Sequence, residues 1–117
     1  MPRSTKCRRV CAEPKSQVFK AESTNSECMI IYVEELESIR LVDYEGWEQG
    51  EAAERMEISR GTFQRILYEA RKKVAEALIQ GKSLVVQGGN YTVASKVCNT
   101  SKRCKHCRFF EEKQKIN

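Results

Sequence analysis

The chain has 117 residues, of which 40% are apolar and 32% are charged, and its formal net charge is +5. This length suits one domain with short appendages, and the apolar content supports a modest core. No apolar run approaches the length that spans a bilayer, and the basic N-terminus lacks the apolar segment of a secretory signal. We therefore expect a cytoplasmic protein with no membrane contact, and the positive charge favours a polyanionic partner.

Residues 1–28 are predicted to form an irregular basic arm with a pair of cysteines. Pro2, Pro14 and scattered hydroxyl side chains interrupt any regular pattern there, and residues 18–20 are at most a short extended piece. The apolar run at residues 29–33 fits either a strand or a segment that is buried beneath the next helix.

Three helices are predicted within residues 29–83. The first spans residues 34–44 and carries Glu34 and Glu35 at its positive N-terminal end, although no good capping residue precedes it. The second spans roughly residues 48–56. The third runs from Arg60 to about residue 80, with Ser59 as N-cap and Gly81 as its stop. Its apolar residues recur every three or four positions and form one stripe: Phe63, Ile66, Leu67, Ala70, Val74, Ala77 and Leu78.

The remainder of the chain is predicted to contain little regular structure. Residues 84–87 are a short strand candidate, Gly88 and Gly89 form a turn, and residues 91–94 are expected to return as the partner strand. This strand and turn segment covers residues 84–95. Residues 96–117 form a basic, cysteine-rich tail.

Residues 47–78 have the order of small, apolar and basic side chains that a helix-turn-helix needs to lay one helix in a DNA groove. Ala52 and Ala53 are small where two helices cross, and Ile58 is apolar in the turn. Glu57 occupies a turn position where glycine is often preferred. The alternative is an ordinary three-helix bundle with a solvated basic face.

The helical phase selects candidate DNA contacts on the third helix. Arg65 lies opposite the apolar stripe, Thr62 and Gln64 lie on its flanks, and the first turns of a recognition helix contact bases. We therefore expect contacts to bases or phosphates from four residues: Arg60, Thr62, Gln64 and Arg65. Three later residues are better placed for phosphates: Arg71, Lys72 and Lys73.

Several blocks of the chain, in order, resemble a known family. They include residues 6–10, 35–46, 59–63 and 70–78, and the match covers about residues 1–91. The family is DUF134, also called UPF0251, of predicted DNA-binding proteins. The resemblance implies a mainly α fold, namely a helix-turn-helix bundle like region 4 of sigma-70 factors with a short β element and cysteine-rich irregular termini. It also implies a role in transcription regulation on double-stranded DNA. Because the chain is too short for a complete sigma factor, we expect a stand-alone regulator.

The cysteines predict a metal site that joins the two termini. Close cysteine pairs supply thiolates to one tetrahedral metal, so the preferred ligands are Cys7, Cys11, Cys104 and Cys107. Cys98 or His106 can replace one of them. Zinc is the first choice, an iron–sulfur cluster is the second, and uncoordinated thiols remain the alternative. Cys28 is expected to be a small core residue.

Two functions other than simple DNA binding stay open. The acidic residues Glu34, Glu35 and Glu37 motivate a metal-stabilised interaction module that contacts RNA polymerase or another protein. A terminal metal site could also sense metal or redox state and change DNA affinity. An enzyme is not expected, because the Cys104–Cys107 pair has no room after it for a thiol oxidoreductase fold. The oligomeric state, including a homodimer, stays open.

Overall fold

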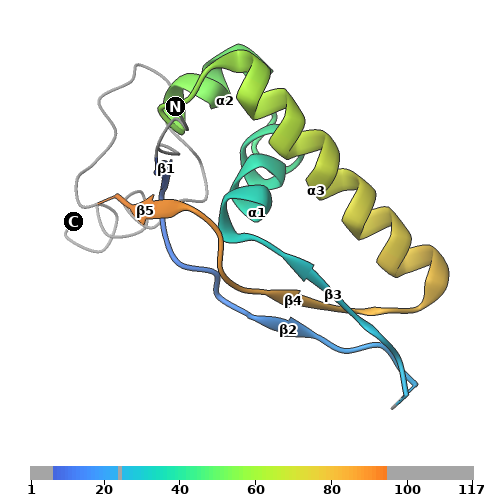
Figure 1. Ribbon diagram of the computed structural model, residues 1–117. Coiled ribbons are helices and arrows are strands. Elements are labelled where there is room, and N and C mark those ends of the chain that lie inside the picture. The colour runs from blue at the N-terminus through green and yellow to red at the C-terminus, as the bar shows by residue number, and fades with distance from the viewer. Residues whose placement is uncertain (1–6, 24, 95–117) are drawn as a thin grey trace, which may run out of the picture.

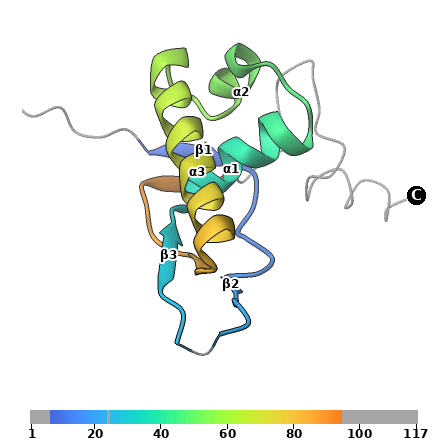
Figure 2. The ribbon, with the colours of Figure 1, turned by 90° about the vertical axis from the view of Figure 1, so that its right-hand side faces the viewer.

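The computed structural model describes residues 7–23 and 25–94, which form three α-helices, one π-helical turn and five short strands. In chain order the elements are β1 (Arg8–Val10), β2 (Val18–Phe19), β3 (Cys28–Ile31), α1 (Val33–Ile39), η1 (Arg40–Tyr44), α2 (Gln49–Arg55), α3 (Arg60–Gln80), β4 (Ser83–Val86) and β5 (Tyr91–Val93). Helices dominate, which confirms a mainly α fold with a small β component. In Figures 1 and 2, α2 lies at the N-terminal end of α3, and strands β2, β3 and β4 lie at the other end.

The strands form two small sheets. In the first, the order is β2-β4-β3, with β3 parallel and β2 antiparallel to β4. In the second, β1 pairs in parallel with β5, and Arg8 lies opposite Tyr91. The short extended piece expected at residues 18–20 is present as β2. The interpretation of the other described residues before Met29 as an irregular arm is wrong, since they supply β1 and the first residue of β3.

The two strands predicted at residues 84–87 and 91–94 form as β4 and β5, but their predicted pairing is wrong, because β5 pairs with β1. Gly88 and Gly89 have φ values of 71° and 105°, and they turn the chain away from the first sheet. The Glu34 carboxylate accepts the backbone N–H of Asn90 at 3.1 Å, and the Asn90 carbonyl accepts the N–H of Arg8 at 3.1 Å. These bonds direct β5 towards β1.

The predicted domain boundaries do not separate independent structural units in the described chain. Cys28 pairs with Ser83 in the parallel ladder of β3 and β4, so the boundaries at residues 28/29 and 83/84 both cut through one sheet. The predicted tail at residues 96–117 lies outside the described residues.

The predicted first helix forms, and its last turn is π-helical. Tyr32 stands at the N-cap without a side-chain cap, as expected, and the Glu35 carboxylate accepts the Tyr32 N–H instead at 2.9 Å. The winding then widens over η1, where the N–H of Glu45 donates to the carbonyl of Arg40 at 2.8 Å.

Helices α2 and α3 form as predicted and are joined by a four-residue turn, residues 56–59. Ser59 caps α3, since its hydroxyl accepts the N–H of Thr62 at 3.2 Å, and Gly81 ends the helix with a φ of 69°. Glu57 has a φ of 60°, in the left-handed region. The preference for glycine at this position thus has a backbone cause.

The main core lies between α1, η1, α2 and α3, and Cys11 joins it from the segment after β1. Phe63 and Leu67 are fully buried there, beside other buried residues that include Leu41, Trp47, Ala52, Ala53 and Met56. A second cluster of Val10, Val33 and Val86 connects the strands to α1. The predicted apolar stripe of α3 is correct except at Leu78, which is 73% exposed because the helix extends beyond the core at its C-terminal end.

Replacement of Glu57 by glycine should stabilise the fold. A non-glycine residue in the left-handed region costs about 1 kcal/mol, part of which is offset by the greater freedom of glycine in the unfolded chain. We expect Glu57→Gly to raise the free energy of unfolding by about 0.5 kcal/mol in urea titration. The matched control is Glu54→Gly in the regular winding of α2, which should lower it by about 1 kcal/mol. Destabilisation by both variants would contradict the assigned turn.

Candidate nucleic-acid interface

The first two turns of α3 hold a polar and basic surface against a buried apolar side. Phe63 and Leu67 face the core with no exposure, whereas Arg60, Gln64 and Arg65 are exposed. Gln64 donates from Nε2 to the Tyr68 hydroxyl at 3.0 Å, one turn further along the same exposed side. Helix α3 therefore presents two guanidinium groups and a carboxamide from a rigidly packed support.

Thr62 is placed differently from the other three predicted base contacts. It is half-buried, its N–H is bound by Ser59, and its hydroxyl accepts a hydrogen bond from the Ser59 hydroxyl at 3.0 Å. Thr62 thus belongs to the cap that starts α3.

Two of the three predicted phosphate contacts are held by acidic partners. The Arg71 guanidinium donates to both carboxylate oxygens of Asp43, at 2.7 and 3.1 Å, and this hydrogen bonding raises the pKa of Arg71. The Lys73 ammonium lies 2.8 Å from the Glu35 carboxylate and 4.3 Å from the centre of the Tyr32 ring. Lys72 is exposed.

The expectation that Lys73 is available to phosphates is corrected by its surroundings. Its side chain is only 16% exposed and fixes α3 to α1. Because a buried carboxylate without a cation is costly, the fold needs Lys73 to neutralise Glu35. Lys72, the next residue, points to solvent instead, since neighbouring positions on a helix are about 100° apart.

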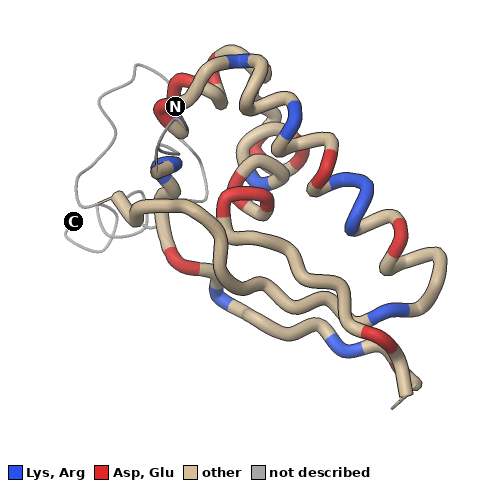
Figure 3. Tube along the Cα trace, in the orientation of Figure 1, with Lys and Arg blue, Asp and Glu red and all other residues tan. Residues whose placement is uncertain are grey.

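The acidic residues of α1 do not form an exposed face. Glu34, Glu35 and Glu37 are each only 5–6% exposed. Glu34 binds the Asn90 N–H, Glu35 binds Tyr32 and Lys73, and Glu37 binds Arg40 with oxygen–nitrogen distances of 2.7 and 2.9 Å. Figure 3 marks acidic residues in red along α1 and basic residues in blue along α3.

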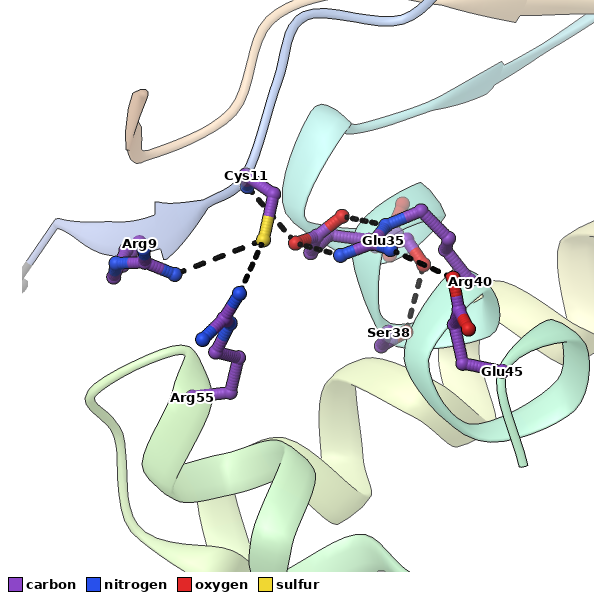
Figure 4. Close-up of polar contacts among 8 residues, drawn as sticks. Arg9, Cys11, Glu35, Ser38, Arg40, Glu45 and Arg55 are labelled. Atoms are coloured by element: carbon purple, nitrogen blue, oxygen red, sulfur yellow. Dashed lines mark hydrogen bonds and ion pairs between the residues drawn. The ribbon is translucent and has the colours of Figure 1, made fainter. Parts of the chain in front are cut away.

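Cys11 lies at a junction of β1, α1 and α2 that the sequence did not reveal (Figure 4). Its N–H donates to Glu37 at 3.0 Å, and its sulfur accepts hydrogen bonds from Arg55 at 3.3 Å and from Arg9 at 3.7 Å. The Arg9 N–H also donates to the carbonyl of Met56 at 3.0 Å. The turn between α2 and α3 is therefore anchored to β1 by its backbone.

The structure does not bring the two predicted N-terminal metal ligands together. Cys7 is exposed and donates to the Asn90 side chain at 3.1 Å, whereas Cys11 is buried after the other end of β1. Four extended residues span roughly 13 Å, but thiolates on one zinc lie about 4 Å apart. Within residues 7–23 and 25–94, no group of three or more His, Cys, Asp or Glu could hold a metal ion. Cys28 is exposed, so its expected core position is wrong. The other predicted ligands lie outside the described residues: Cys98, Cys104, His106 and Cys107.

The fold and this surface define a small, mainly α protein in which a short helix and a long helix meet at a tight turn. The family model described as "Protein of unknown function DUF134" matches residues 1–94. The chain belongs to this family, which confirms the resemblance.

Similar proteins carry the family's other name. A UPF0251 protein of Ruminiclostridium cellulolyticum is 52% identical over 95 residues, which cover 81% of this chain and 75% of that protein. A UPF0251 protein of Thermoanaerobacter pseudethanolicus is 52% identical over 96 residues, which cover 80% of this chain and 81% of that protein. A UPF0251 protein of Caldicellulosiruptor bescii is 46% identical over 107 residues, which cover 92% of this chain and 74% of that protein. No solved structure matches. Among the described helices, none has the length and apolar character needed to cross a membrane.

The neighbours Lys72 and Lys73 should respond differently to the same substitution. We expect Lys73→Met to lower the free energy of unfolding by about 2–4 kcal/mol, because it leaves the Glu35 carboxylate buried without its cation. Lys72→Met is the matched control and should change it by no more than about 0.5 kcal/mol. Urea titration of both variants measures the difference, and equal effects would contradict the assigned ion pair.

Proposed function

We propose that the protein is a cytoplasmic, DNA-binding transcriptional regulator that contacts duplex DNA with the N-terminal turns of α3. One observation carries the proposal. Arg60 and Arg65 are exposed on the first two turns of α3, Arg65 lies opposite the buried Phe63 and Leu67, and neither arginine has an ion pair within the described residues. Exposed guanidinium groups on a packed helix suit guanine edges and phosphates, which both accept paired hydrogen bonds.

The junction of α2 and α3 supports the same function. A helix-turn-helix needs small residues where its helices cross and a turn that reverses direction in few residues. Ala52 and Ala53 are buried at the crossing, Ile58 packs against the core, and Glu57 adopts the left-handed turn conformation. The resemblance of the sequence to a sigma-70 region 4-like family supports the finer form of the proposal, in which α3 is the recognition helix.

The contacts of each side chain refine its role in the proposal. Arg60, Gln64 and Arg65 contact bases or nearby phosphates, and Lys72 contacts a phosphate two turns beyond Arg65. Arg71 forms an ion pair with Asp43, and Lys73 forms one with Glu35. Both residues therefore orient α3, and neither is a main DNA contact in this proposal. Thr62 starts the helix.

The alternative function, a protein-interaction module, was motivated by an acidic face on the first helix, and that face is not exposed. Glu34, Glu35 and Glu37 are buried and bound within the protein, so they present no acidic surface to a partner. A metal is likewise not part of the proposal, since Cys7 and Cys11 are separated along β1.

Duplexes selected from a random DNA pool test the proposal. Affinity of the wild type for a selected duplex should fall steeply with salt, because bound cations are released from the phosphates. Arg65→Ala should weaken binding to the selected duplex by roughly 1–3 kcal/mol, and Lys72→Ala should weaken selected and scrambled duplexes alike. Fluorescence anisotropy measures both effects.

The matched control is Lys15→Ala, which removes one positive charge from the exposed connection between β1 and β2. It should change affinity much less than Arg65→Ala does. Binding that is insensitive to salt, or equally weakened by all three variants, would overturn the proposal.

A further inference from the structure

A groove of about 860 Å³ lies at the C-terminal end of α3, between that helix and the connection from β2 to β3. One wall comes from the last turns of α3, and the other comes from β2, β4, residues 20–23 and residues 25–27. Its apolar lining consists of Phe19, Ala21, Ala77, Leu78 and Leu84.

Large apolar side chains are exposed in and beside this groove. Phe19 is 53% exposed and Leu78 is 73% exposed, and both line the groove. Soluble monomers rarely expose such neighbouring large apolar residues, and patches of this kind mark interaction surfaces.

The charges around the groove narrow the choice of occupant. Its lining contains two lysines, Lys20 and Lys82, and two glutamates, Glu22 and Glu27, so their charges cancel although the whole chain carries +5. A neutral, mixed rim does not attract nucleic acid. It also does not repel a second copy of the same surface.

We propose that this groove is a dimer interface and that its occupant is a second copy of this chain, related by a twofold axis. In such an interface the same patch serves both partners. Leu78 of each copy inserts between Phe19 and Leu84 of the other, and Lys20 of each copy lies opposite Glu22 of its partner.

Because the groove lies far from the proposed DNA contacts, this dimer is compatible with DNA binding. Its formation does not depend on DNA binding. Helix α3 has 21 residues and is about 31 Å long, so the interface and the exposed Arg60 and Arg65 lie at opposite ends. The described chain ends at β5, away from the groove (Figure 1). A dimer thus leaves both DNA-contacting ends accessible, and it forms whether or not DNA binding is confirmed.

Sedimentation velocity of the full chain over a concentration series, without DNA, tests the proposal. The wild type should move from the monomer mass of 13.5 kDa towards twice that value. Leu78→Glu should raise the dimer dissociation constant by about tenfold or more, because it places a charge in an apolar contact. Tyr68→Glu is the matched control on α3: it replaces another exposed large side chain outside the groove and should leave the dissociation constant unchanged.

A charge reversal tests the twofold pairing separately and uses exposed residues that the fold does not need. Lys20→Glu should weaken the dimer by about threefold to tenfold, and the double variant Lys20→Glu/Glu22→Lys should restore it. A chain that stays monomeric at all concentrations overturns the proposal, including the case in which residues 95–117 fill the groove. A dimer that tolerates Leu78→Glu and Lys20→Glu overturns it as well, since it then uses another surface.

Discussion

The structure depends on the buried carboxylate of Glu37, which joins three segments at one point. It accepts the N–H of Cys11 and two hydrogen bonds from the Arg40 guanidinium, and it is only 5% exposed. A buried carboxylate is stable only when its partners are in place. The segment after β1, helix α1 and the start of η1 must therefore assemble together. Arg55 and Arg9 then connect this junction to α2 and to the turn before α3, which fixes the direction in which α3 leaves the core.

The helices could be predicted because their signals are local. Ser59 and Gly81 bound α3, and the apolar stripe gives its buried side. Glu57 stands at a turn position that often takes glycine, and the structure shows that its φ lies in the left-handed region. The strand pairing could not be predicted. Strands of two to four residues carry no usable alternation, and their partners come from the opposite end of the described chain, as with β1 and β5. The irregular arm and the hairpin were the natural interpretations of Gly-, Pro- and Ser-containing segments whose order comes from tertiary hydrogen bonds.

The exposed part of the candidate site followed from helical phase and from position in the helix. Arg65 lies opposite Phe63 and Leu67, Gln64 lies on a flank, and Arg60 is exposed at the first residue of α3. The partners of charged residues could not follow from phase or position. Lys73 and Glu35 are far apart in sequence, and only the packing of α3 on α1 shows that they neutralise each other. The same applies to Cys11, whose spacing from Cys7 suggested a metal pair although its thiol accepts guanidinium hydrogen bonds. Leu78 continues the apolar periodicity of α3 past the end of the core, so its place in the periodic pattern does not predict its burial.

The central claim is that the N-terminal turns of α3 contact DNA while its C-terminal end does not. Backbone amide NMR shifts on addition of random-sequence duplex DNA test this most directly, because they report location without a known target. The account predicts that the largest shifts occur at residues 59–66, that smaller ones occur near Lys72, and that residues 78–84 stay unchanged at constant protein concentration. The absence of shifts, or shifts concentrated at residues 78–84, would contradict it.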